Sequence, residues 1–424
     1  MKNGPASLSQ GRLVWSPDDR IHVSVRIQSG ESSMTLSNLI ASLRPSALAL
    51  MTAAFVFGAS APASAEAACT SVDTPRCMVK LPTGIDMAYI EVGPADGKPV
   101  LLIHGLTDSV RSWSLAMDAL HKIDPSLHIL AVDLRGHGQS SMPDAKACAS
   151  APETCYRISD LAGDVVAFMQ AKGISKADLA GHSMGSFVVQ EIAITHPEMV
   201  GHAVLDATGA KSVGNAALGD FVLKQTIEGA WKPALEAKGL AYPSGVYELT
   251  PLDADPKAME WIAANWTLDP AAEPSFLTPY TPETAKVRLG TWIGATKGLL
   301  AQDNTERLKT LKVPALVMWA TQDSIYLAKD QDEIKASLKE AAAKAGTTFY
   351  WKEYGKKPLP ASGAQESDIG HNIQWSAAET VAKDIHSFIT TGAPTLDLVY
   401  SDEAPNVTKL IVEPGKAVVE KISN

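Results

Sequence analysis

The sequence predicts an α/β protein, with a mostly parallel sheet, helices on both of its faces and a mainly helical insertion. Three observations predict this fold class. Apolar, strand-like segments alternate with helix-like segments up to residue 210, the alternation returns after residue 301, and the intervening residues 211–300 contain helix-like pieces without clear strands. Repeated strand–helix units favour parallel strands, because each crossover helix covers one face of the sheet.

The chain has 424 residues, of which 46% are hydrophobic and 20% charged, so it can bury a sizeable core. Its formal net charge of −10, without a basic stripe, argues against nucleic acid or anionic membrane surfaces as partners. No phosphate loop, dinucleotide fingerprint or metal-binding cluster is present, so we expect neither a cofactor nor a metal.

The N-terminal segment, residues 1–65, resembles a secretory signal with an upstream extension. Arg44 precedes an apolar run, Ala47–Gly58, and an A-x-A cleavage site ends at Ala65. The run is too short to span a bilayer, so we expect no stable membrane anchor and a periplasmic or secreted protein. An uncleaved anchor or a buried helix remains an alternative, and translation could begin at Met34 instead of Met1.

Four cysteines lie beyond this signal and could pair in three ways. The local pairing, Cys69 with Cys77 and Cys148 with Cys155, closes two small loops and suits an oxidising compartment. Free thiols are the alternative.

Residues 66–210 predict the first part of the sheet. "CMVKLPTGIDMAYIEVG" predicts two strands, "PVLLIHG" a strand buried on both faces, Val110–Leu120 a helix and "LHILAVDLRGHG" a strand. "YRISDLAGDVVAFMQAKG" has the spacing of an amphipathic helix, and "ADLAGHS", "MGSFVVQEIAITH" and "GHAVLDATG" predict strand, helix and strand.

Residues 301–392 predict the second part. "VPALVMWATQD" and "TFYWKEYG" are the expected strands, and Leu327–Ala345 and "WSAAETVAKDIHSFITTG" the expected helices. The C-terminal extension, residues 393–424, contains "TKLIVEPGKAVVEKI", which predicts a hairpin of unassigned role.

Ser183 occupies the centre of Gly181-His182-Ser183-Met184-Gly185, which fits G-x-S-x-G between a strand and a helix. In this context the motif predicts a sharp turn that lifts a nucleophilic serine above the sheet edge. A tight turn without catalytic function is the alternative.

A serine nucleophile requires a base and an orienting acid. Asp323 follows a predicted strand, and His371 lies in a loop between the last strand and the last helix. Their order after Ser183 is the one described for this architecture. Asp206, at the end of the strand after the nucleophile helix, is a rival acid. Three further histidines, more typical of surface or packing positions, are His196, His202 and His386.

The oxyanion site requires two backbone donors. We expect the amides of Met184, directly after the nucleophile, and of Leu106, in the loop after "PVLLIHG". His104 is expected to support that loop, with a role as second base as the alternative.

Five ordered motifs, "LLIHGLTDSVRSW", "AVDLRGHGQSS", "GHSMGS", "ALVMWATQDSIY" and "GHNIQW", resemble the α/β-hydrolase fold superfamily over roughly Val79 to Thr391. The resemblance implies a nucleophile at Ser183, an acid at Asp323 and a base at His371. It also implies oxyanion amides at Leu106 and Met184, and a cap over the active site formed by residues 211–300.

Two residues at the nucleophile motif help to define which members of the superfamily the sequence resembles. Ser186 stands where many relatives have a third small glycine, which leaves the nucleophile undisturbed. Ser183 in place of aspartate argues against the dehalogenase-like and epoxide-hydrolase-like members, which attack through a carboxylate.

Tryptophans are frequent in the insertion and predict an apolar, partly aromatic pocket. The candidates for substrate contact are Trp113, Trp261, Trp266 and Trp292. The alternative is that they hold the cap together.

These features predict an exported serine hydrolase that cleaves a small apolar or aromatic ester or a lactone. The same triad could instead cleave a C–C bond or an amide, or transfer an acyl group. A non-catalytic binding protein is the third hypothesis, which a complete triad order argues against. The sequence predicts no oligomeric state.

Overall fold

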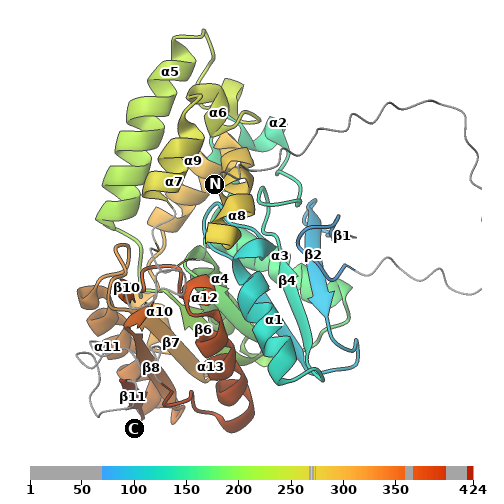
Figure 1. The fold of residues 1–424 in the computed structure, drawn as a ribbon, viewed down its shortest axis with the longest axis vertical. Helices are drawn as coiled ribbons and strands as arrows, with labels where there is room; N and C mark the ends of the chain where they lie inside the picture. Colours follow the sequence, from blue (N-terminus) through green and yellow to red (C-terminus); the bar gives the residue numbers. More distant parts are fainter. Residues whose placement is uncertain are drawn as a thin grey trace, which may run out of the picture. The chain divides into compact units, whose positions relative to one another are not determined.

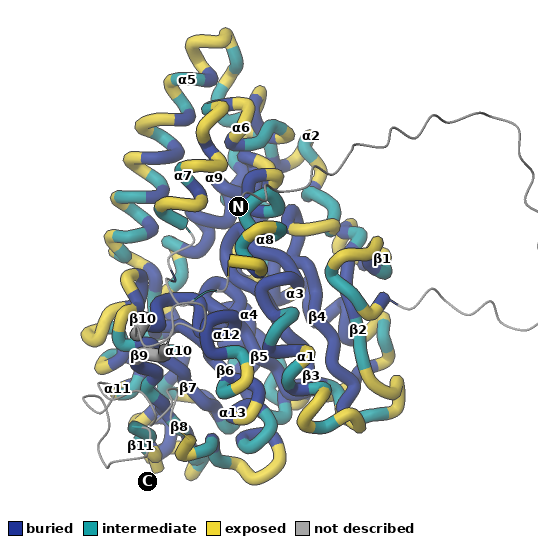
Figure 2. The backbone as a smooth tube through the Cα atoms, viewed as in Figure 1, coloured by how far each residue is buried: buried dark blue, intermediate teal, exposed yellow. Residues whose placement is uncertain are grey.

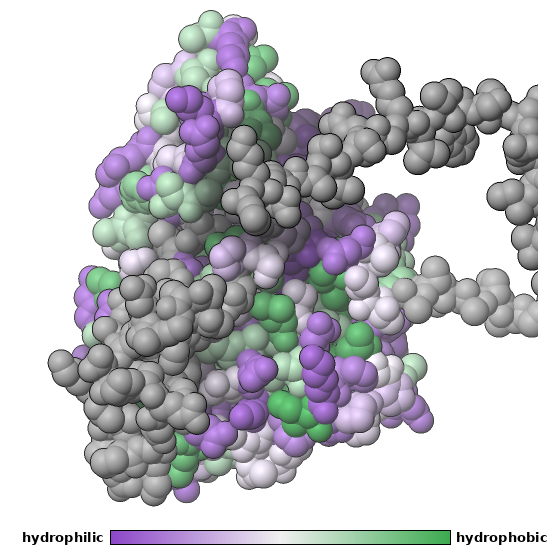
Figure 3. All heavy atoms as spheres, viewed as in Figure 1, coloured by the Kyte–Doolittle hydropathy of each residue, from purple (hydrophilic) through white to green (hydrophobic). Residues whose placement is uncertain are grey.

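The computed structural model describes residues 69–266, 269, 272, 274–358, 366–397 and 418–423, all within one compact unit, Ser64–Asn424. The predicted signal and upstream extension, residues 1–65, lie outside the described residues. Within the described part, none of the helices combines the length and apolar character needed to cross a membrane. On the face drawn in Figure 3, hydrophobic residues form separate spots among hydrophilic ones.

A nine-stranded sheet forms the centre of the fold, in the order β1-β2-β4-β3-β5-β6-β7-β8-β11 (Figure 1). Six neighbouring strands, from β4 to β8, are parallel, whereas β1, β2 and β11 pair antiparallel at the two edges. The strands are β1 Cys77–Lys80, β2 Asp86–Val92, β3 Pro99–Ile103, β4 His128–Val132, β5 Ala177–His182, β6 Val200–Asp206, β7 Ala315–Ala320, β8 Phe349–Tyr354 and β11 Val419–Ile422. A separate pair is β9 Lys356–Pro358 with β10 Glu366–Asp368.

Helices cover both faces of this sheet, as the strand–helix alternation predicts. Along β3, Val100 and Leu102 pack in a core cluster with α1 and α13, whereas Leu101 and Ile103 pack in the cluster that includes α3, α4 and α11. These central strands are buried on both sides, shown in dark blue in Figure 2. The helices are α1 Ser114–Ile123, α3 Ile158–Ala171, α4 Met184–Thr195, α11 Ala328–Ala345 and α13 Ala378–Thr391, with short turns η1 Val110–Trp113, α2 Ala145–Cys148, η2 Pro152–Cys155, η3 Pro197–Met199, α10 Thr305–Leu308 and α12 Ile373–Ser376.

The described part of the insertion is helical and lies together above the sheet in Figure 1. A bridge between Lys211 and Asp303 joins the two ends of this insertion. Its helices are η4 Ala217–Trp231 (a π-helix), α5 Lys232–Glu236, η5 Ser244–Val246, α6 Pro251–Ala254, α7 Ala258–Asn265, α8 Pro274–Lys286 and α9 Leu289–Leu300. We call residues 211–300 the cap.

The tail contributes one strand to the sheet. β11 pairs antiparallel with the edge strand β8, with Ile422 opposite Phe349. The first half of the hairpin expected from the tail sequence lies outside the described residues.

The two disulfides join Cys69 to Cys77 and Cys148 to Cys155. The second closes a loop directly before Tyr156, whose hydroxyl lies 2.9 Å from Thr291 Oγ1 on α9. Thr291 in turn donates to Gly136 O in the loop after β4. Gly136 has φ +74°, and a Cβ there would lie only 2.2 Å from Thr291 Oγ1, so this cap-to-core contact requires glycine.

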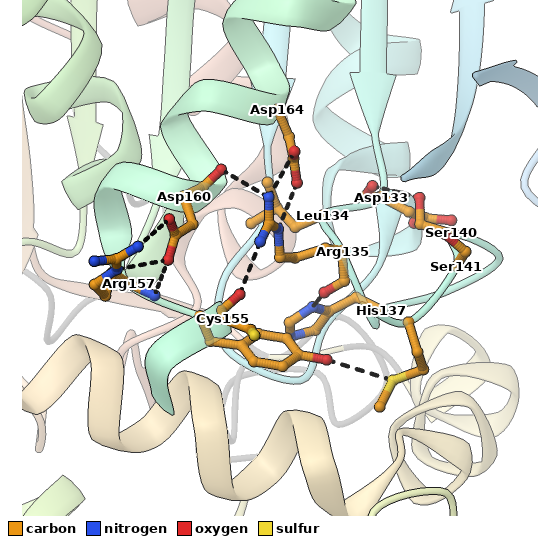
Figure 4. A network of polar contacts seen from close by, with 12 residues as sticks. Asp133, Leu134, Arg135, His137, Ser140, Ser141, Cys155, Arg157, Asp160 and Asp164 are labelled. Atoms are coloured by element: carbon orange, nitrogen blue, oxygen red, sulfur yellow. Dashed lines mark hydrogen bonds and ion pairs between the residues drawn. The ribbon is translucent and has the colours of Figure 1, made fainter. Parts of the chain in front are cut away.

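A buried ion pair anchors the same loop to α3 (Figure 4). The Arg135 guanidinium binds both carboxylate oxygens of Asp164, at 2.6 and 2.7 Å, and donates to the carbonyl oxygens of Cys155 and Asp160. A second pair lies one turn away, where the Arg157 side chain, 66% exposed, binds Asp160.

Breaking the buried pair should cost much more stability than breaking the exposed pair. Asp164→Ala should lower the free energy of unfolding by about 3–5 kcal/mol, because it leaves a buried guanidinium without its counter-ion. Arg157→Ala, the control at the residue before the same helix, should cost less than about 1 kcal/mol because the Arg157 side chain is exposed to solvent. Urea denaturation followed by tryptophan fluorescence measures both free energies of unfolding. Equal losses in the two variants would contradict the stabilising role given to the buried Arg135–Asp164 pair.

Candidate active site

Ser183 lies at the junction of β5 and α4 with φ +51° and ψ −118°, a conformation that is strained for a residue with a side chain. The flanking glycines make it sterically possible. A Cβ at Gly181 would lie 2.2 Å from Gly185 O, and a Cβ at Gly185 would lie 2.3 Å from Ile103 O. Backbone bonds hold the turn, since Ser183 N donates to Asp206 O and Ser186 N donates to Ser183 O, both at 2.9 Å.

The structure brings His371 against Asp323. His371 Nδ1 lies 3.0 Å from each carboxylate oxygen of Asp323. The carboxylate also accepts bonds from the amides of Ile325 and Tyr326, at 2.8 and 3.1 Å. His371 Nε2 is buried and has no hydrogen-bond partner among the described residues, and both His371 and Ser183 line one pocket. The second ring nitrogen is therefore available for proton transfer.

Asp206, the rival acid, has a different environment. It is fully buried, and its two carboxylate oxygens have no hydrogen-bond donor among the described residues. Burial raises the pKa of Asp206 to about 7, with the charges of Asp323 and Asp269 adding to the effect and His182 opposing it. The imidazole of His371 is bound to Asp323 and not to this carboxyl group.

The pocket around Ser183 is small and is lined partly by the cap. Its free space is about 20 Å³, roughly the room of one water molecule. Its lining combines residues of both parts of the fold: Leu106, Asp108, His182, Ser183, Ile325, His371 and Asn372 from the core, and Leu218, Trp266 and Tyr280 from the cap.

The loop after β3 provides one candidate oxyanion donor, because Leu106 lines this pocket. Met184 is the first residue of α4, and the first amides of a helix have no partner within it. Next to Leu106, Thr107 has φ +60° and its hydroxyl accepts a 2.8 Å bond from Trp266 Nε1 of the cap. Both proposed amides therefore lie on segments that flank the serine.

His104 supports the same loop. Its Nε2 accepts a bond from the Leu134 amide at 2.9 Å, and its Nδ1 lies 2.8 Å from Gly105 O. Burial lowers the pKa of His104 to about 4, so the ring is neutral and both nitrogens are occupied. These contacts favour the supporting role over that of a second base.

The four tryptophans expected to contact substrate lie in different environments. Trp266 lines the pocket. Trp113 instead lies fully buried in the core and donates to Ile103 O at 3.0 Å. Trp261 packs on Phe221 and Trp231, and Trp292 is fully buried against Trp231 and Trp266. Trp113, Trp261 and Trp292 are not among the residues that line this pocket, and their contact with substrate stays a prediction.

The three histidines that the sequence assigns to surface or packing positions do not line the pocket. His386 lies 3.4 Å from Asp124, His202 lies 2.8 Å from Asp178, and His196 lies 2.9 Å from the Thr195 hydroxyl.

Sequence reasoning did not identify Asp108, Leu218 or Ile325 as lining residues. Asp108 carries a readable signal, since an acidic side chain directly follows the predicted oxyanion loop. Leu218 and Ile325 are ordinary apolar residues that only the packing of the cap brings to the serine.

Comparison with known proteins places this geometry in a family. A model of the alpha/beta hydrolase fold matches residues 98–353, and the chain belongs to that family. It is 32% identical over 155 residues to a Bacillus subtilis protein that carries the name 2-succinyl-6-hydroxy-2,4-cyclohexadiene-1-carboxylate synthase, covering 34% of this chain and 53% of that one. A Variovorax paradoxus protein named as a carbamate hydrolase is 30% identical over 233 residues, 55% of this chain and 77% of its own length. Other relatives are named as epoxide hydrolases.

The chain thus spans about half the length of the Bacillus relative. Among solved structures, the enol-lactonase from Burkholderia xenovorans superposes with a TM-score of 0.52 at 20% identity, covering 74% of this chain and all of that one. At this identity the likeness concerns the fold.

The two candidate acids, Asp323 and Asp206, can be distinguished by activity. Asp323→Asn should lower kcat by about 10³- to 10⁴-fold, because the amide no longer holds His371 in its working tautomer. Asp206→Asn, the matched control, should change kcat by less than about 3-fold. Steady-state hydrolysis of a p-nitrophenyl ester measures both, and a larger loss at Asp206 would reverse the assignment.

Asp206 should also affect stability as a function of pH. Its pKa rises from the ordinary 3.8 to about 7 on folding, so between these values the folded chain holds a proton that the unfolded chain releases. Stability is therefore lost as the pH rises through this window. Asp206→Asn removes this linkage, so its stability relative to the parent should rise as the pH increases from about 4 to about 7, as measured by urea denaturation. A difference that does not change with pH would contradict this account.

Proposed function

We propose that the protein is a serine hydrolase that cleaves a carboxylic ester or a lactone through an acyl-enzyme. The observation that carries the proposal is the His371 imidazole, which is held by Asp323 at 3.0 Å and shares a buried pocket with Ser183 at its strained turn. A turn of this kind is destabilising by itself and is maintained by the surrounding structure, which is typical of a functional site.

In the proposed mechanism, Ser183 Oγ attacks the carbonyl carbon while His371 Nε2 takes its proton. The amides of Leu106 and Met184 stabilise the negative oxygen of the tetrahedral intermediate, aided by the positive end of α4. His371 then gives the proton to the leaving alcohol, and the C–O bond breaks. Water attacks the acyl-enzyme by the same steps and releases the acid, which regenerates Ser183.

The pocket lining supports a small apolar or aromatic substrate. Leu218, Trp266 and Ile325 contribute apolar side chains to the lining, and Asn372 and Asp108 contribute polar groups. The name of the Variovorax relative supports one alternative, the use of the same triad on a carbamate or amide bond. Two further alternatives would use the same triad. Cleavage of a C–C bond differs from ester hydrolysis in the leaving group, and acyl transfer differs in the acceptor, which is then not water.

We also propose that the protein is exported to the periplasm or the medium. The support is the signal-like N-terminal sequence together with two disulfides, which persist in oxidising compartments.

Ser183→Ala should abolish ester hydrolysis, with kcat lower by about 10⁴-fold or more, and should leave the melting temperature nearly unchanged. The same variant should no longer react with a fluorophosphonate probe. Ser212→Ala, which removes a buried serine bound to Tyr326 outside the pocket, is the control and should keep both activities.

A panel of p-nitrophenyl esters of increasing chain length, lactones and amides then ranks the substrate classes by kcat/KM. Undiminished hydrolysis in Ser183→Ala would contradict the proposed nucleophile, and faster turnover of amides than of matched esters would contradict the proposed bond type.

A further inference from the structure

A buried chain of polar contacts runs from the cap to the backbone of the proposed base. The hydroxyl of Tyr280, on α8, donates to Asp108 Oδ1. The other carboxylate oxygen of Asp108 lies 3.6 Å from His182 Nδ1, and His182 Nε2 lies 3.0 Å from the carbonyl oxygen of His371. All four residues are buried, with side chains at most a few per cent exposed, and we call them the Tyr280–His371 chain.

The acceptors in this chain define its proton positions. Because the His371 carbonyl can only accept, His182 Nε2 must carry a proton. The other ring nitrogen, Nδ1, lies 3.6 Å from Asp108, a close polar contact that is longer than a hydrogen bond. Burial alone would raise the pKa of Asp108, but His182, His104 and Tyr280 outweigh it and hold that pKa below its usual range. The Asp108 carboxylate thus contacts the cap through Tyr280 and the serine turn through His182.

Gly105 leaves room for this arrangement. A Cβ at this position would lie 2.8 Å from His182 Nδ1, 3.2 Å from Asp108 Oδ2 and 3.2 Å from Ser183 Cβ. The absence of a side chain allows the oxyanion loop to approach the nucleophile and the His182–Asp108 pair at the same time.

Helix α8 also contacts the segment after the base. The Tyr280 and Trp375 rings meet edge to face at 4.4 Å between centroids, and Phe276 meets the same indole at 4.8 Å. Trp375 is four residues after His371, in α12. One turn further along α8, Glu283 binds Arg111 at 2.8 Å and accepts a bond from Ser109 at 3.0 Å. The face of α8 that carries Phe276, Tyr280 and Glu283 is thus the one docked on the core.

We propose that His182 is a positioning residue for His371, and that Asp108 and Tyr280 couple it to α8, so that the base reaches its working position only when α8 is docked. This inference rests on the proposed function. Tyr280 and Trp266 of the cap line the pocket together with Ser183 and His371, so a displacement of α8 would alter the pocket and the chain at once. With α8 docked, the contacts of the chain are formed and His182 binds the carbonyl oxygen of His371.

Tyr280→Phe tests the coupling, because it removes the hydroxyl and keeps the ring that packs on Trp375. We expect kcat to fall by about 10- to 100-fold with KM within about 3-fold of the parent, the pattern of a misplaced base and not of weaker binding. Tyr247→Phe is the matched control, since it removes another buried hydroxyl bond between cap and core, to Pro143 O at 3.1 Å. It should leave kcat within about 2-fold.

His182 is tested by two substitutions. His182→Gln places an amide donor near the position of the histidine Nε2, whereas His182→Leu has a similar volume and no donor. His182→Gln should therefore retain a higher kcat than His182→Leu. The direct readout is the downfield proton NMR signal of His371 Nδ1–H bound to Asp323. Tyr280→Phe and His182→Leu should broaden it or lose it through faster exchange with water, and Tyr247→Phe should keep it.

The inference is overturned if Tyr280→Phe retains both kcat and the downfield signal to the same degree as Tyr247→Phe. It is also overturned if His182→Gln and His182→Leu lose kcat equally while both remain folded. Neither result touches the nucleophile, because Ser183→Ala tests the proposed function separately. Activity retained in Ser183→Ala would instead overturn the proposed function and the inference with it.

Discussion

The rest of the site depends on one local constraint, the left-handed backbone of Ser183 between β5 and α4. The residues two positions before and after it, Gly181 and Gly185, must be glycines, because a Cβ at Gly181 would clash with the carbonyl of Gly185 and a Cβ at Gly185 with the carbonyl of Ile103. The serine is thereby lifted above the end of the parallel strands, where the loops after β3, β7 and β8 meet. The same constraint brings His182 towards the backbone of His371 and places the start of α4 next to the serine.

Much of this could be predicted from the sequence, because the determining interactions are local. The strand–turn–helix context of Ser183, the apolar runs of β3 and β7 and the position of Asp323 after a strand are all readable along the chain. The order of the motifs favours Asp323 over Asp206, although both lie at the ends of strands on the same edge of the sheet. The contact between Asp323 and His371 depends on the path of the loop that carries the imidazole.

The composition of the pocket was the least predictable part. Tryptophans in a cap are large apolar groups that can fill a core or line a cavity, and the sequence does not distinguish these outcomes. Trp292 became part of the cap interior, whereas Trp266 turned its indole nitrogen to Thr107 beside the serine. Asp108 and Tyr280 meet only because the cap folds back over the loop after β3, across 172 residues of sequence. Contacts of this range are set by packing and leave little local pattern.

The most direct test of the account is to trap the acyl-enzyme formed from a slowly hydrolysed p-nitrophenyl ester by acid quench, and to locate the acyl group by peptide mass spectrometry. The account predicts a single acylated peptide, modified at Ser183, that accumulates in the first turnover. An acyl group on another residue, or turnover without any covalent adduct, would contradict it.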